Sequence, residues 1–120
     1  MQDYDSAVEI GRALIGALDA TNTLVIASSD MTHYEPAKSA AAKDHAALKA
    51  ATDLDAKGFY ETVENQNITA CGYAPITALI TYAVGVNAKA QLLSYHNSGD
   101  ITGDHSSVVG YASVVFKKQP

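Results

Sequence analysis

The pair Asp30 and His33 is the first candidate for chemistry in this chain. The two residues stand three positions apart, directly after the apolar run 24–27. A carboxylate beside an imidazole orients the ring and raises its basicity, which suits a catalytic acid or base. In the simpler interpretation, His33 is a turn residue and Asp30 caps the segment that follows. The pair therefore predicts a catalytic site, with a structural turn as the alternative.

Cys71, the single cysteine, is the second candidate. Gly72 follows it, and Pro75 suits the start of a helix. A helix amino end favours the thiolate, the form that acts as a nucleophile or a metal ligand. Most free cysteines are instead small buried apolar residues. Both interpretations stay open at this point.

A glycine-rich polar loop over residues 98–104 is the third candidate. It could hold a polar substrate, or it could be a solvated turn between two strands. The residues proposed to contact a substrate are Ser98, Gly99, Asp100 and Asp104. Two histidines flank this loop and one lies in an alanine-rich segment, and each is expected to be a surface or packing residue: His45, His96 and His105.

Serine hydrolase chemistry is disfavoured, although Ser28 and Ser29 precede the Asp30 and His33 pair. In a catalytic triad the serine bonds the imidazole while the acid bonds the other ring nitrogen, and neighbours on one turn rarely allow both. The Gly-x-Ser-x-Gly motif is also absent from the sequence. A cysteine–histidine amidase that uses Cys71 is the stronger enzymatic alternative.

Composition narrows the function classes. The chain has 120 residues, 48% of them hydrophobic and 18% charged, which is typical of one globular domain. A net charge of −5 with eight basic residues disfavours nucleic-acid binding. No apolar run is long enough to span a membrane, and no signal peptide is visible. A single cysteine cannot form an internal disulfide, so a cytoplasmic location is expected.

The pattern of elements predicts an α/β fold with a small mixed sheet and packed helices. The apolar run 24–27 is typical of a strand buried on both faces, as in a parallel sheet. We expect its carboxyl end to carry the site, as in open α/β sheets. Ser6 and Glu9 predict a capping box. The expected helices cover residues 3–18, 36–51 and 75–85, with Pro36 as the first residue of the second, and a further short helix is capped by Asp55. The other expected strands cover residues 88–95 and 107–117.

Four motifs together resemble the carboxyl-terminal half of Memo family proteins, also labelled AmmeMemoRadiSam system protein B in prokaryotes. Their order and spacing extend over nearly the whole chain. The motifs are SSDMTHY at 28–34, ACGYAPI at 70–76, YHNSGDITGD at 95–104 and SVVGYA at 107–112. The resemblance implies half of the LigB-like fold of class III extradiol dioxygenases, whose cleft holds non-haem iron.

The resemblance also implies roles for single residues. His33 takes the place of the acid–base histidine and Asp30 that of the neighbouring acid. Cys71 falls where the Memo family has a cysteine in place of the metal-binding glutamate of the dioxygenases. A thiolate is a softer ligand, so copper or zinc becomes plausible beside iron. The two metal-binding histidines of the family belong to the amino-terminal half, and no motif in residues 1–120 matches them.

The expected function is therefore that of a Memo-family, dioxygenase-like fragment whose cleft is completed by an amino-terminal half or by a partner chain. On this hypothesis residues 1–120 form a single α/β unit that binds no metal tightly by itself. An uncovered apolar surface would favour self-association. The alternatives are a non-enzymatic ligand-binding or protein-binding module on the same fold, and the cysteine–histidine amidase.

Overall fold

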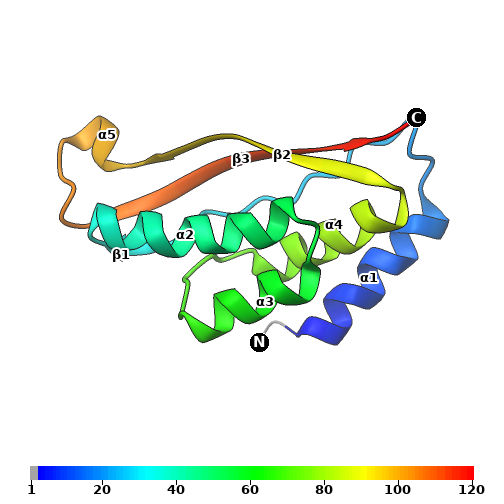
Figure 1. Ribbon diagram of the computed structural model, residues 1–120, viewed down its shortest axis with the longest axis horizontal. Coiled ribbons are helices and arrows are strands. Elements are labelled where there is room, and N and C mark those ends of the chain that lie inside the picture. The colour runs from blue at the N-terminus through cyan, green and yellow to red at the C-terminus, as the bar shows by residue number, and fades with distance from the viewer. Residues whose placement is uncertain (1–2) are drawn as a thin grey trace.

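One long antiparallel hairpin forms most of the sheet. The computed structural model describes residues 3–120. β2 and β3 form the hairpin around the single helical turn α5, and the short β1 pairs with the other edge of β3 (Figure 1). The bounds are β1 His33–Glu35, β2 Ala88–Asn97, α5 Gly99–Thr102 and β3 Val108–Lys118. The prediction that the last two strands are neighbours is confirmed, with α5 as an unpredicted turn inside the loop.

Four longer helices lie on one side of this sheet (Figure 1). They are α1 Tyr4–Ala17, α2 Ala37–Thr52, α3 Ala56–Asn65 and α4 Tyr73–Gly85. α2 and α4 contact the strands. α3 packs against α2 and α4, and α1 packs against α4. Gly11 allows that last contact, because a Cβ there would lie 2.5 Å from the Ala78 carbonyl oxygen. The predicted α/β class is confirmed, but the predicted mixed sheet is wrong, because every strand pair in the described chain is antiparallel.

Helix starts follow local capping signals, with three corrections. The Asp55 side chain accepts from the Gly58 N–H and caps α3 as predicted. The predicted capping box at Ser6 is wrong, because Asp3 is the N-cap and Ser6 donates to it. Pro36 directly precedes α2 instead of being its first residue. α4 begins two residues before the predicted start at residue 75, so that proline still falls in its first turn, where it interrupts no helical hydrogen bond.

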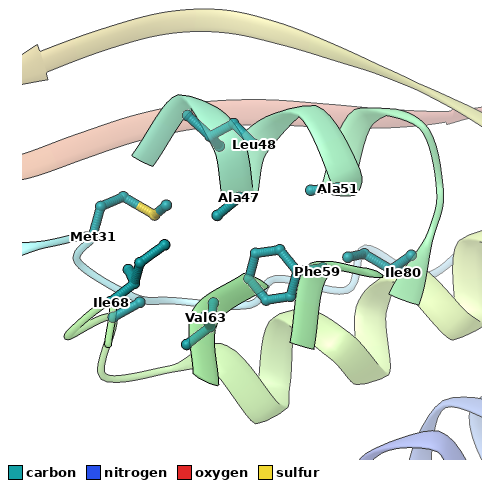
Figure 2. Packing of buried hydrophobic residues seen from close by; sticks show 9 residues of the cluster. Met31, Ala47, Leu48, Ala51, Phe59, Val63, Ile68 and Ile80 are labelled. Atoms are coloured by element: carbon teal, nitrogen blue, oxygen red, sulfur yellow. The ribbon is translucent and has the colours of Figure 1, made fainter. Parts of the chain in front are cut away.

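The core lies between α2, α3 and α4, with the hairpin above it. Phe59 and Ile80 are 1% and 0% exposed, and the alanines of α2 let the helices approach closely. Figure 2 shows these side chains converging from three helices, from the segment before β1 and from the segment between α3 and α4. The cluster consists of Met31, Ala47, Leu48, Ala51, Phe59, Val63, Ile68, Ala70 and Ile80. The site described below is connected directly to this core through Met31.

The predicted buried strand at residues 24–27 is wrong. These residues belong to no strand, and Leu24 and Ile26 are 83% and 75% exposed. A strand needs a hydrogen-bonded neighbour, and the described chain places none beside this run. Asp30 and His33 therefore lie where the chain enters β1, and not at the carboxyl end of a parallel strand. None of the helices in residues 3–120 has the length and apolar character needed to cross a membrane.

Candidate functional site

Two hydrogen bonds to Thr69 hold His33. The His33 backbone N–H donates to the Thr69 hydroxyl at 2.7 Å, and ring Nδ1 lies 2.8 Å from the Thr69 carbonyl oxygen. A carbonyl oxygen only accepts, so we assign the ring proton to Nδ1, which leaves the lone pair of the neutral ring on Nε2. Nε2 lies 3.4 Å from Asp30 Oδ2. The ring atom beside the carboxylate is therefore the one able to take up a proton.

A bulge in β1 sets the direction of His33. The register between β1 and β3 shifts between His33 and Glu35, and Tyr34 between them has φ 60. The left-handed backbone turns the Tyr34 side chain outward, where it is 78% exposed. The side chains on either side of it stay half-buried. Such bulges re-aim side chains beside functional sites.

Cys71 lies beside Ser29. The Ser29 hydroxyl oxygen is 3.7 Å from Cys71 Sγ and accepts from the Gly72 N–H at 2.8 Å. The same hydroxyl donates to the Asp30 carbonyl oxygen at 2.6 Å. The approach requires Gly72, because a Cβ there would lie 2.6 Å from the Ser28 carbonyl oxygen. The exposed thiol stands directly before Gly72, the N-cap of α4.

Segments 29–33 and 69–72 thus lie side by side, joined through Ser29 at one end and Thr69 at the other. The sequence indicated which residues could do chemistry but missed both of these hydroxyl contacts. Serine and threonine are too common in turns to signal a long-range contact by themselves. The structure brings the three predicted residues onto adjacent segments, and the roles predicted for them stay predictions.

A buried carboxylate that sequence reasoning missed supports the same turn. Asp44 on α2 is 0% exposed. Its Oδ1 accepts from the Thr32 N–H at 3.0 Å and from the Thr32 hydroxyl at 2.6 Å, and its Oδ2 accepts from the Tyr95 hydroxyl at 2.6 Å. The pKa of Tyr95 is raised, mainly because its hydroxyl is buried and next because that hydroxyl donates to the Asp44 carboxylate. Helical spacing in the sequence could have indicated that Asp44 is buried, since it shares the buried face of α2 with Ala40, Ala47 and Leu48.

The predicted substrate loop begins next to β1. The Val109 N–H donates to Ser98 Oγ at 3.0 Å. Val109 is the residue of β3 that pairs with His33 of β1. Asp100 accepts from the Asn97 N–H, and this bond lowers its pKa, with smaller contributions from the two flanking histidines. His96 Nδ1 and His105 Nε2 lie 3.6 and 3.7 Å from its two oxygens.

The other acid of the loop makes local contacts. Asp104 Oδ1 accepts from the N–H and the hydroxyl of Ser106, which forms a tight turn. Gly99 is buried, and a Cβ there would lie 2.7 Å from the His105 ring. The remaining histidine, His45, packs its ring against Tyr95 with centroids 4.7 Å apart, which agrees with the expected structural role. Within residues 3–120, the hydrogen bonds and ion pairs of both loop acids are thus made with the loop and its flanking residues.

The donor types at this site fit a transition metal, but their number does not. Iron, copper and zinc accept imidazole, thiolate and carboxylate donors and need three or four of them. In the part of the chain that the structure describes, no group of three or more such side chains is placed to hold an ion. A pocket of about 220 Å³ lies beside Thr69, and Asp30, His33 and Cys71 are not among its lining residues. It is lined by Val63, Glu64, Asn67, Ile68, Thr69 and Tyr73.

Comparisons with known proteins agree on one family. A family model described as Memo-like protein matches residues 1–115. The chain is 47% identical over a 119-residue alignment to a MEMO1 family protein of Methanocaldococcus jannaschii, and the match covers 97% of this chain and 42% of that protein. It is 42% identical over 121 residues to a relative from Methanopyrus kandleri, covering 98% of this chain and 43% of the relative. The chain therefore spans less than half the length of these relatives.

Proposed function

We propose, given that this chain belongs to the Memo-like protein family, that it supplies an acid–base pair and a thiolate to a metal-site cleft. The supporting observation is the adjacency of Asp30, His33 and Cys71 on two segments joined by Ser29 and Thr69. The chemistry proposed is oxidative, of the dioxygenase type that the Memo resemblance implies. With O₂ as the oxidant, a bound iron or copper ion would supply the redox chemistry, whereas zinc would supply Lewis-acid chemistry only.

His33 acts in this proposal as the proton acceptor. The Nδ1 proton is held by the Thr69 carbonyl, so a proton leaving a substrate hydroxyl is taken up at Nε2. Asp30 Oδ2 at 3.4 Å stabilises the imidazolium that results. We assign the substrate side to the loop that begins at Ser98, because Ser98 Oγ accepts from the N–H of Val109, the register partner of His33; Asp100 and Asp104 are the carboxylates of that loop.

Cys71 acts as the metal ligand that this chain contributes. Its thiol is exposed directly before Gly72, the N-cap of α4, and Sγ lies 3.7 Å from the Ser29 hydroxyl oxygen, so it faces the segment that carries Asp30 and His33. The other ligands come from the part of the Memo-like fold that lies outside this chain, on the same polypeptide or on a partner. We place this chain at the carboxyl-terminal side of that fold, and we expect the working protein in the reducing cytoplasm, where the thiol stays free.

A full-length chimera tests the proposal. In it, this chain replaces the matched 119-residue region of the Methanocaldococcus jannaschii relative. Metal content is measured by mass spectrometry, and oxidative cleavage is assayed with catechol. Cys71→Ser should lose metal, whereas His33→Ala should keep metal and lose cleavage. Lys57→Gln is the control, because Lys57 is exposed on α3 and its ion-pair partner Glu61 lies on the same helix, and it should keep both.

Two results would contradict the proposal. If the chimera with Cys71→Ser keeps its full metal content, the thiolate is not a ligand. If the 120-residue chain binds stoichiometric metal tightly by itself, its ligands are not missing. A chimera that binds no metal and cleaves no catechol would favour the non-enzymatic binding module instead.

A further inference from the structure

Segment 23–28 is an unpaired strand edge. Leu24 and Ile26 are 83% and 75% exposed, while Val25 and Ala27 are half-buried. Alternation of this kind is typical of extended backbone. Within residues 3–120, the backbone groups of segment 23–28 have no hydrogen-bond partner. Free backbone groups flanked by exposed apolar side chains are a template for an added strand.

The segment also separates from β3 and leaves an apolar groove. Close to the site, the Met31 N–H donates to the Gly110 carbonyl and the Gly110 N–H donates to the Thr32 carbonyl, both at 2.9 Å. Toward residue 23 this pairing ends, and a pocket of about 280 Å³ opens between the segment, α4 and the end of β3. Apolar residues that line it include Leu79, Ala83, Val114, Val115 and Phe116.

The length of the relatives and the position of the site together indicate what covers this edge. The chain spans 42% and 43% of the two relatives, so more than half of each lies outside the matched region. Segment 23–28 leads directly into Asp30 and His33, so a strand paired with it approaches the acid–base pair. Additional ligands are required at that place, whereas a second copy of this chain would bring only the same incomplete set.

We propose that segment 23–28 pairs with a β-strand from the part of the Memo-like fold that lies outside this chain. The added strand covers Leu24 and Ile26 and satisfies the free backbone groups. The inference rests on the proposed function, in which that same part supplies the missing metal ligands. It goes further because it names the surface and the mode of association.

Hydrogen exchange in the chimera tests the pairing directly. The backbone amides of segment 23–28 should exchange at least about tenfold more slowly in the chimera than in the isolated chain, because paired amides are protected. The double variant Leu24→Lys/Ile26→Lys should remove this protection. Ile101→Lys is the matched control, because Ile101 is 91% exposed on α5, and it should leave the protection unchanged.

Co-expression provides a second measurement that does not require the chimera to fold. The tagged chain is produced together with the residues of the same relative outside the matched region. The pair should co-purify, and the double lysine variant should weaken the association at least about tenfold, because two apolar side chains lose their burial. Ile101→Lys should not weaken it.

Each other outcome overturns the inference. Equal exchange at residues 23–28 in the chimera and in the isolated chain, or association that survives the double lysine variant, would place the docking surface elsewhere. Protection in the isolated chain that increases with its concentration would make a second copy the occupant. Metal content is measured in the same samples, so a chimera that holds metal without protecting this segment refutes the docking surface alone.

Discussion

Tyr95→Phe removes a single hydroxyl from the buried network behind the site, and it should destabilise the fold by about 2 kcal/mol. The hydroxyl donates to Asp44 Oδ2 at 2.6 Å, and Asp44 is 0% exposed, so water does not readily replace the donor. A hydrogen bond to a charged group contributes roughly 1.5–3 kcal/mol. Phenylalanine keeps the ring and its contact with His45, so the hydroxyl bond is the main term lost.

Urea denaturation followed by circular dichroism measures this loss. With a slope of about 2 kcal/mol per molar urea, the midpoint should fall by about 1 M while the slope stays unchanged. Tyr111→Phe is the matched control, because Tyr111 is 45% exposed on the adjacent strand, and it should change stability by less than about 0.5 kcal/mol. Equal effects of the two substitutions would refute the reasoning that burial gives this bond its value.

Three further changes test other parts of the fold. Gly110→Ala should cost about 1–3 kcal/mol in a urea titration, because its Cβ would collide with the Asp44 carboxylate. Gly16→Ala, in open space on α1, should instead stabilise by about 0.5 kcal/mol. Burial and then Glu64 raise the pKa of Tyr60 from 10.0 to about 12. The stability that neutral Tyr60 contributes is therefore present below pH 10 and should be lost as pH rises toward 12, and urea titrations of the protein and of Tyr60→Phe across this range measure the loss.

Local signals predicted most helices and two of the strands. Asp55 caps α3 and Gly85 ends α4, because capping and backbone freedom depend on neighbouring residues in the chain. The same reasoning failed at Ser6, where two overlapping cap signals compete and Asp3 supplies the cap. β1 was not predicted, since three residues that include a bulge carry no periodicity.

Strand pairing at residues 24–27 could not be predicted from the run itself. Its composition is that of a strand, and Leu24 and Ile26 alternate with Val25 and Ala27 as a strand requires. A strand, however, is defined by a hydrogen-bonded neighbour, and that neighbour is a property of the whole fold. The run is therefore strand-like in sequence and unpaired in this structure.

The sequence by itself determined the chemistry available to this protein: an acid three residues before a histidine, one thiol at a helix start, and a glycine-rich loop. These features are local, so residue type and spacing are enough to identify them. Only the tertiary structure decided that Thr69 fixes the His33 ring, that Ser29 contacts Cys71, and that Asp44 is buried under Tyr95. These contacts join residues 36 to 51 positions apart, and chain folding alone brings such residues together.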